Sequence, residues 1–337
     1  MIKIEDRKKR IKNAIDKSFN LLKDCSICPR KCRVDRFKGS LGFCRTGISP
    51  EVFSYMPHHG EEPPISGEKG SGTIFFYNCN MACVYCQNYK FSQDNSPSNS
   101  PDALGRGSGR RVAYFKDKGR GEASFEDLAG IMLTLQQKGC HNINLVTPTH
   151  VMPQILKALD IAFERGLDLP IVYNTSGYEL PEMISLLSGI VDVYLVDMRY
   201  SSSGLAVKYS NAPGYPKYNK LAVKEMFRQF PEAHFDKDGI MQKGLIIRHL
   251  VLPNGLAGTC ETMSFIAQEL SADVYISLMS QYTPYYKASS FKELSRRITQ
   301  AEYRQAKDIM DSCGLYNGWV QEGGGLEHLA GVNIKPV

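Results

Sequence analysis

The sequence lacks any long apolar run, and no stretch approaches the roughly 18 uninterrupted apolar residues that a membrane-spanning helix requires. Its first residues, MIKIEDRKKRIKNAIDKSF, are charged and have no apolar core of the signal-peptide type. The sequence also lacks a large excess of charge of one sign, because the formal net charge is only +6 in 337 residues. Such a small excess does not argue for nucleic acid as a partner. These absences predict a cytoplasmic protein with no membrane partner.

Cysteine, in contrast, is plentiful and unevenly placed. The chain has ten cysteines, and seven of them lie between Cys25 and Cys86. In a reducing compartment, clustered cysteines indicate metal binding and not disulfides. They form two groups. The first is a CxxxCxxC run, and the second supplies four thiols over residues 25–44.

The second half of the chain alternates between β-prone runs and amphipathic helical segments. The β-prone runs cover residues 72–77, 143–146, 170–174, 191–197, 244–252 and 273–279. About six β-then-α units of this kind predict a parallel sheet with helices outside, curled by right-handed crossovers into a partial (βα)6 TIM-like barrel. Ligands in such folds bind at the carboxyl ends of the strands.

Helix signals and loop composition divide the chain further. Ser124 with Asp127 and Thr299 with Glu302 form capping-box patterns at two helix starts. Residues 1–70 are predicted to be an extension with an amphipathic helix near 4–23 and a loop-rich, cysteine-containing stretch. Residues 71–337 form the core barrel. The polar stretch 94–123 is expected to be a flexible insertion, and the Ser-, Gly- and Tyr-rich residues 198–218 a loop that covers the site.

The first cysteine group has the chemistry of an iron–sulfur site. Cys79, Cys83 and Cys86 directly follow the first strand of the array. Three thiolates on a tight loop can bind three irons of a [4Fe–4S] cubane and leave the fourth iron open to another ligand. A three-thiol zinc site is the alternative, but structural zinc requires four ligands.

A CxxxCxxC run at the mouth of a barrel, with an aromatic residue before its last cysteine, resembles the radical S-adenosylmethionine (SAM) superfamily. The resemblance implies that the open iron chelates the methionine moiety of SAM. One electron from the cluster would then cleave SAM and form a 5′-deoxyadenosyl radical that abstracts hydrogen from a substrate. It also implies an oxidoreductase that takes electrons from a low-potential donor such as flavodoxin or ferredoxin.

Four longer segments, CNMACVYCQNYKFSQ, INLVTPTH, DVYLVDMRY and IIRHLVLPNG, resemble relatives of the pyruvate formate-lyase activating enzyme. This finer resemblance implies activation of a glycyl-radical-type protein. The sequence departs from the pattern at two points. Thr147-Pro148-Thr149-His150 stands where many radical SAM enzymes have a Gly-Gly-Glu turn, and no ferredoxin-like cysteine insert follows the first motif.

The resemblance also assigns residues to the SAM site. Tyr85 would pack against the adenine, and Thr147 and Thr149 would replace the glycine-rich turn at the amine. The remaining candidates follow or close later strands: Asn174, Ser176, Asp197, Arg248, His249 and Gln281. Only one of the adjacent pair Arg248 and His249 can point into the barrel, because neighbouring side chains on a strand face opposite sides.

The second cysteine group comprises Cys25, Cys28, Cys32 and Cys44. Four soft ligands can close a tetrahedral zinc ion or an iron–sulfur cluster. The sequence is compatible with either metal centre, and zinc is the first hypothesis.

Two other readings compete with a radical enzyme that acts on a protein glycine. One is a radical SAM enzyme that modifies RNA, favoured only by the basic insertion and the net charge. The other is a non-catalytic metal-binding scaffold. The sequence does not identify the substrate, protein or small molecule, and it does not identify a catalytic residue beyond the cofactor site.

Overall fold

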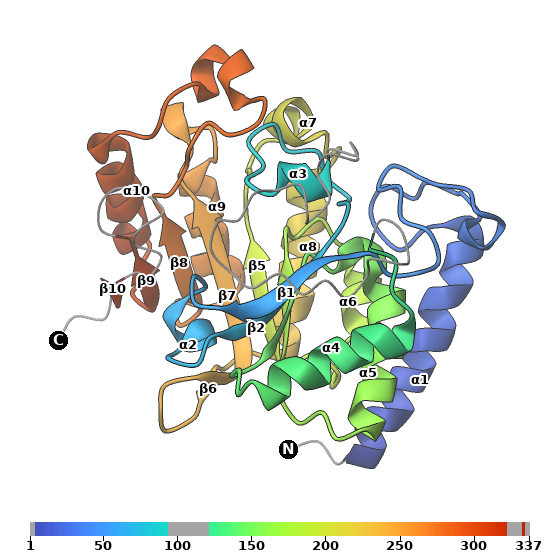
Figure 1. Cartoon of the computed structure of the whole chain (residues 1–337). Coiled ribbons are helices and arrows are strands. Elements are labelled where there is room, and N and C mark those ends of the chain that lie inside the picture. The colour runs from blue at the N-terminus through green and yellow to red at the C-terminus, as the bar shows by residue number, and fades with distance from the viewer. Residues whose placement is uncertain (1–3, 94–120, 322–331, 334–337) are drawn as a thin grey trace, which may run out of the picture.

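The computed structural model describes residues 4–93, 121–321 and 332–333. Its centre is a curled parallel sheet in which the order β2-β3-β4-β5-β7-β8-β9 follows the chain (Figure 1). Each new strand joins beside the previous one, so the crossovers roll the sheet in one direction. The sheet does not close, since antiparallel β1 lies at one edge and β10 at the other. The partial (βα)6 barrel predicted from the alternation is confirmed.

Six of the seven parallel strands lie close to their predicted positions, and the seventh, β9, was not predicted. The seven strands are β2 Ser71–Phe76, β3 Ile143–Val146, β4 Ile171–Thr175, β5 Val193–Asp197, β7 Met241–Leu250, β8 Tyr275–Met279 and β9 Gly318–Val320. The short strands β6 His234–Phe235 and β10 Val332–Asn333 pair with β7 and β9.

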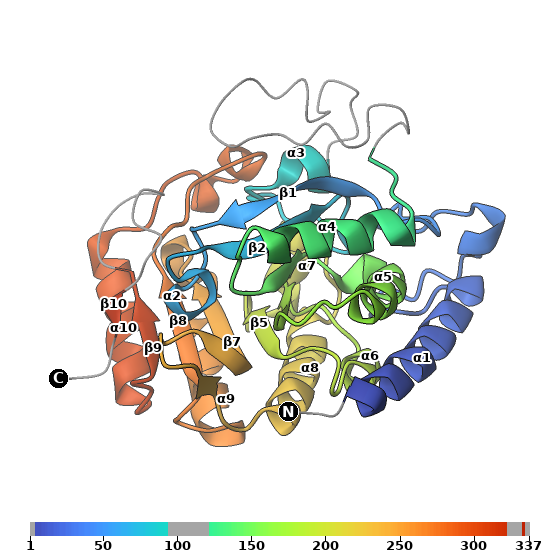
Figure 2. The ribbon, with the colours of Figure 1, turned by 60° about the horizontal axis from the view of Figure 1, so that its bottom comes forward.

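Helices cover the outer face of this sheet (Figure 2). They are α4 Phe125–Gln137, α5 Met152–Glu164, α6 Pro181–Leu186, α8 Tyr215–Gln229, α9 Thr259–Glu269 and α10 Gln300–Ser312. Both predicted capping boxes are present, at the starts of α4 and α10. The N-terminal helix α1, Ile4–Asn20, packs along α5. Ile11, Ala14 and Leu22 belong to the same hydrophobic core as the barrel helices.

Two segments differ from the prediction. Within the stretch expected to be loop up to residue 70, Val52–His58 forms β1, which pairs antiparallel with β2, and Pro63–Ser66 forms the short helix α2. The expected loop 198–218 contains helix α7, Ser203–Ser210, and the first turn of α8. Ser202 caps α7 by accepting a hydrogen bond from the amide of Leu205.

The segment after β1 enters the barrel from its amino-terminal end. Figure 2 shows α2 at this end of the curled sheet. Ile65 is fully buried and packs in a cluster that includes Val172 of β4, Val193 of β5 and Ile246 of β7. Residues 59–66 therefore act as a plug that fills the lower half of the barrel interior.

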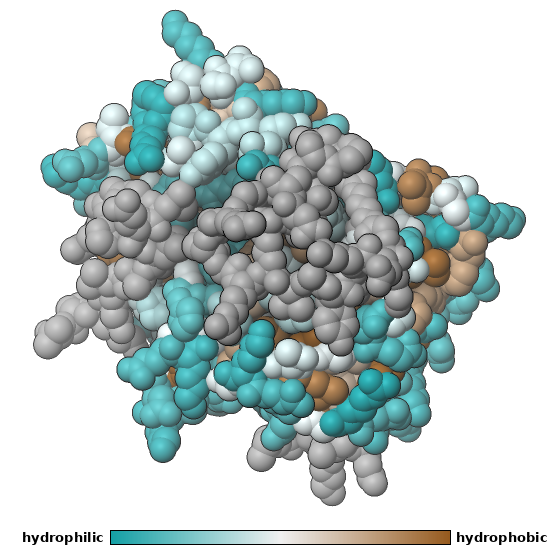
Figure 3. Space-filling view, in the orientation of Figure 1, coloured by the Kyte–Doolittle hydropathy of each residue, from teal (hydrophilic) through white to brown (hydrophobic). Residues whose placement is uncertain are grey.

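The expected insertion 94–123 lies almost wholly outside the described residues. No helix among the residues that the structure covers is both long and apolar enough to cross a membrane. Apolar residues gather on the surface at the right of Figure 3. In the cysteine-rich part of the chain, Phe37 and Leu41 are 51% and 55% exposed.

Candidate active site

Residues 77–86, the central cysteine loop, leave the carboxyl end of β2. The chain turns at Asn78, whose φ of 70° lies in the left-handed region that asparagine tolerates better than most residues. The amides of Ala82 and Val84 donate to the carbonyls of Ser210 and Tyr209 at 3.0 and 2.8 Å. The end of α7 therefore pins the loop over the mouth of the barrel.

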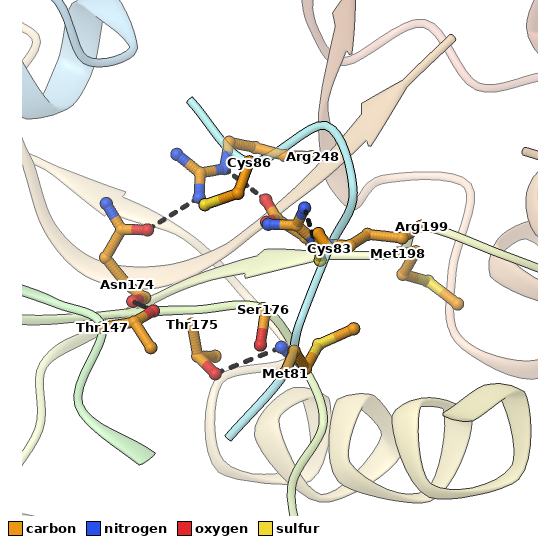
Figure 4. A network of polar contacts seen from close by, with 12 residues as sticks. Met81, Cys83, Cys86, Thr147, Asn174, Thr175, Ser176, Met198, Arg199 and Arg248 are labelled. Carbon is orange, nitrogen blue, oxygen red and sulfur yellow. Dashed lines mark hydrogen bonds and ion pairs between the residues drawn. The ribbon is translucent and has the colours of Figure 1, made fainter. Parts of the chain in front are cut away.

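A cavity of about 380 Å³ opens beside this loop at the carboxyl ends of the strands. Cys79, Cys83 and Cys86 all line it. Figure 4 shows Cys83 beside the guanidinium group of Arg199. The cavity is therefore bordered by thiols on the side of the central cysteine loop and by charged and polar groups from the strand ends.

Arg248, on β7, is the centre of the polar wall. Its Nε donates to Asp197 Oδ1 at 2.8 Å and its Nη2 donates to Asn174 Oδ1 at 2.7 Å. Its Nη1 lies 3.4 Å from Glu61 Oε2, on the plug segment. Four chain segments distant in sequence are thus joined by one guanidinium group. Figure 4 shows its hydrogen bond to Asn174.

Arg199 extends this network to the thiols. It forms an ion pair with Asp197 Oδ2, and its Nη1 lies 3.9 Å from Cys83 Sγ. A chain of alternating charges therefore runs from Glu61, through Arg248, Asp197 and Arg199, to a cysteine of the central cysteine loop.

Burial and ion pairing act in opposite directions on the carboxyl groups. Burial raises the pKa of Glu61, although Arg248 opposes the shift. Burial raises the pKa of Glu62, which neighbours it on the plug, to about 7. Burial alone would raise the pKa of Asp197, but the guanidinium groups of Arg248 and Arg199 outweigh it and lower that pKa. Asp197 therefore stays ionised beside the cavity.

Each thiol of the central cysteine loop has a polar neighbour. Ser210 Oγ donates to Cys83 Sγ at 3.0 Å, and Ser92 Oγ lies 3.3 Å from Cys86 Sγ. The amide of Met81 donates to Cys79 Sγ at 3.4 Å. Burial raises the pKa of Cys79 to about 12, so this thiol keeps its proton until a metal displaces it.

The thiols fit an iron–sulfur cluster better than a single ion. Among the described residues, no three His, Cys, Asp or Glu side chains converge tightly enough to hold one metal ion. A cubane does not need such convergence, because each of its cysteines binds a different iron. Three soft ligands beside an open cavity suit a cluster with one iron left for another ligand.

Most residues that the resemblance assigns to the site do border the cavity. They are Tyr85, Thr147, Asn174, Ser176, Asp197, Arg248 and Gln281. The hydroxyl of Tyr85 lies 2.6 Å from that of Tyr200. His249 faces the other side of β7, where its Nδ1 lies 2.8 Å from the carbonyl of Met198. Only Arg248 of the adjacent pair points inward, as the strand geometry predicts.

Thr149 does not border the cavity. The chain enters a turn of 3-10 helix at this residue, and the side chain turns into the core. Its Oγ1 donates to Glu179 Oε1 at 2.6 Å, and Thr175 Oγ1 donates to the same oxygen at 2.6 Å. Burial raises the pKa of Glu179 to about 7. In the turn that the resemblance aligns with Gly-Gly-Glu, Thr147 therefore borders the cavity and Thr149 packs in the core.

The structure adds two charged residues that sequence reasoning did not select. Arg199 follows Asp197 by two residues and could have been found, because alternate residues of an extended strand share a face. Glu61 could not have been found in this way, because its position depends on how residues 59–66 enter the barrel. Its Oε1 accepts hydrogen bonds from the side-chain amides of Asn144 and Asn174 at 3.1 and 3.3 Å.

The upstream cysteines lie in one neighbourhood on a separate loop. Cys25, Cys28 and Cys44 are buried, and Cys32 is half-buried. Burial raises the pKa of Cys28 to about 12, and the thiols of the other three add to the increase, which shows that all four are close. They do not converge on one point. A single zinc ion would therefore require the thiols to draw closer together than they are.

Comparison with known proteins gives one relative in sequence and several in structure. No family model matches the chain. An uncharacterized protein of Methanocaldococcus jannaschii is 30% identical over 302 residues, which are 88% of this chain and 77% of the relative.

Among solved structures, HydG, a maturase of the [FeFe]-hydrogenase, aligns with a TM-score of 0.45 at 10% identity, over 95% of this chain and 66% of HydG. TsrM from Kitasatospora setae, a radical S-adenosylmethionine methyltransferase, aligns with a TM-score of 0.39 at 13% identity. That match covers 68% of this chain and only 38% of TsrM. These scores are too low to transfer an activity, so the case for function rests on the residues of the site.

Proposed function

The chain belongs to the same family as the uncharacterized protein of Methanocaldococcus jannaschii. Because the name of that relative states no activity, we propose a function from the residues of the site. The protein is a radical SAM enzyme that holds a [4Fe–4S] cluster at Cys79, Cys83 and Cys86. One observation carries the proposal: these three thiols and a buried network of charged groups border the same cavity at the carboxyl ends of a curled parallel sheet.

When bound, such a cluster supplies the electron that cleaves the C5′–S bond of SAM. The chain's own residues provide the binding site. Arg199 and Arg248 offer guanidinium groups suited to a carboxylate, and Asp197 offers an ionised acceptor for an amine. Ser176 Oγ is buried and has no hydrogen-bond partner, so it is ready for a ligand group.

The finer activity we propose is hydrogen abstraction from a substrate, with a glycine of a partner protein as the first candidate. Support comes from the resemblance of the central cysteine loop and three strand-end segments to relatives of the pyruvate formate-lyase activating enzyme. Electrons would come from a low-potential donor such as flavodoxin or ferredoxin. All ten cysteines are free thiols, which agrees with a reducing compartment such as the cytoplasm.

We also propose that the upstream cysteines bind a metal, either zinc or a second iron–sulfur cluster. The closeness of the four thiols supports it. Metal analysis of the purified protein, with and without the Cys28→Ser substitution, distinguishes the two. Loss of zinc in the variant indicates a zinc site, and loss of iron indicates a second iron–sulfur cluster.

The main proposal is tested by anaerobic reconstitution with iron and sulfide, followed by dithionite and SAM. We expect 5′-deoxyadenosine from the wild-type protein and none from Cys83→Ala, which should also lack the cluster signal in optical and electron paramagnetic resonance (EPR) spectra. Cys260→Ala is the matched control, because Cys260 is exposed at the start of α9. An intact cluster in the wild-type protein that yields no 5′-deoxyadenosine would overturn the proposal.

A further inference from the structure

Arginines alternate with cysteines in the upstream loop, which we define as the cysteine-rich segment, residues 25–45. Arg30 stands between Cys28 and Cys32, and Arg45 follows Cys44. Together with Arg36, these arginines extend out of the segment. Each donates a hydrogen bond either to the central cysteine loop or to a residue that contacts this loop. Three separate contacts thus join two cysteine groups that are distant in sequence.

Arg30 makes the most direct contact. Its Nε donates to the carbonyl of Asn80, inside the CxxxCxxC run, at 2.6 Å. The guanidinium group stacks on the Phe43 ring, 3.2 Å from its centroid. This cation therefore lies between the upstream thiols and the central ones.

Arg36 acts through a buried histidine. Its Nη1 donates to the carbonyl of His150 at 2.9 Å, and its Nη2 lies 3.5 Å from Cys44 Sγ. The His150 ring in turn places Nε2 2.7 Å from the carbonyl of Tyr77, at the start of the central cysteine loop. Arg36 is only 2% exposed and its Nε has no hydrogen-bond partner. A guanidinium group cannot shed its charge, so its position depends strongly on the sulfur beside it.

Arg45 acts through a glutamine. Its Nη2 donates to the carbonyl of Gln93 at 3.1 Å. The side-chain amide of Gln93 donates to the carbonyl of Cys83 at 2.9 Å. Arg33, in contrast, belongs to the same segment but pairs with the exposed Asp24 and does not reach the central cysteine loop.

We propose that Arg30, Arg36 and Arg45 are positioning residues through which the cysteine-rich segment holds the central cysteine loop in place. Arg30 and Arg45 stand within two residues of an upstream cysteine, and Arg36 lies 3.5 Å from Cys44 Sγ. Ligation of the upstream thiols therefore stiffens the central loop, and loss of their ligand loosens it. The consequence for SAM chemistry rests on the proposed function. The effect of upstream ligation rests on the metal proposed for those cysteines. The link through the three arginines rests on neither proposal.

Hydrogen exchange of the backbone tests the link without any cluster or SAM. The amides of Ala82 and Val84 are hydrogen-bonded to α7, so peptides covering residues 78–93 should exchange slowly in the wild-type protein. Arg30→Met keeps an unbranched stem but removes the charged donor, and it should speed exchange there by about tenfold or more. Arg33→Met is the matched control and should leave the rate unchanged.

Upstream ligation is tested in the protein as purified, with its metal content measured. Cys28→Ser should speed exchange in residues 78–93 by a similar factor, although Cys28 is not part of that loop. If buried Arg36→Met does not fold, Arg45→Met and Arg30→Lys give the same test, and Arg30→Lys should recover part of the protection. Equal exchange in Arg30→Met, Arg45→Met and Arg33→Met would overturn the proposal.

A second readout concerns the reconstituted cluster. Removing the positive charge of Arg30 should lower the midpoint potential of the central cluster, whereas Arg33→Met should not. If the wild-type protein forms no 5′-deoxyadenosine but the exchange difference is present, the proposed function fails and the positioning role stands. The reverse result would retain the enzyme and reject the link.

Discussion

Arg248→Met should destabilise the protein strongly, because Asp197 and Glu61 would lose the cation that lies between them. Their side chains are only 9% and 10% exposed, and that of Arg248 is 16% exposed. At an effective dielectric constant of about 20, unit charges at these separations attract by roughly 5 to 6 kcal/mol. Measured costs of removing one partner of a buried pair are smaller, about 3–5 kcal/mol. The lower end applies here, since Asp197 retains Arg199.

A double-mutant cycle isolates the contribution of Glu61. Glutamine at this position keeps an oxygen for the amides of Asn144 and Asn174 but carries no charge. Glu61→Gln should therefore cost little by itself and recover about 1–3 kcal/mol when combined with Arg248→Met. Equilibrium unfolding in urea gives the free energies of unfolding of the four proteins.

A cost of less than about 1 kcal/mol for Arg248→Met, a value typical of an exposed ion pair, would contradict this prediction. The prediction would also be refuted if Glu61→Gln added to the cost of Arg248→Met instead of reducing it. Either result would mean that the carboxylates do not depend on this guanidinium group.

Three further changes test other parts of the structure. Burial raises the pKa of Glu179 from 4.5 to about 7, so the folded state holds a proton that the unfolded state releases and stability falls as pH rises through that window. The loss of unfolding free energy between about pH 5 and about pH 8, measured in urea, should be up to about 3 kcal/mol smaller in Glu179→Gln. The same pH dependence in both proteins would contradict the raised pKa of Glu179. Ile65→Ala should cost about 2–5 kcal/mol and Ile65→Val about 0.5–1.5, whereas equal costs would mean that the plug is loosely packed. Gly177→Ala should lower the melting temperature, because φ is +74° and a Cβ atom would lie 2.1 Å from Asn219 Nδ2; an unchanged value would place the glycine in a looser turn.

The barrel could be predicted because local signals agreed with the global fold. β-Prone runs and amphipathic helical patterns marked six of the parallel strands and their helices, and the Ser124 and Thr299 capping boxes appeared where the sequence placed them. Strand β1 gave no such signal. It contains Pro57, which an edge strand tolerates because one side of it needs no backbone donor. Its pairing with β2 reverses the chain direction within an otherwise parallel pattern, and that depends on contacts beyond the local sequence.

The candidate site was predictable where it follows from strand ends and not where it depends on turns. Asn174, Asp197 and Arg248 lie on neighbouring parallel strands, so their convergence follows from sheet order. Thr149 lies two residues past its cavity-facing neighbour Thr147, in a turn that rotates its side chain into the core. Residue spacing alone does not encode that rotation.

The plug explains why the cavity ends where it does. A curled parallel sheet that does not close leaves room inside that the short strands β3 and β4 do not fill. Ile65 fills the lower part, and Glu61 rises above it to meet Arg248. The floor of the cavity is therefore made by a segment that precedes the first parallel strand, and not by the strands that carry the other polar groups. Changes in residues 59–66 would alter the depth and charge of the cavity while the sheet and the central cysteine loop keep their positions.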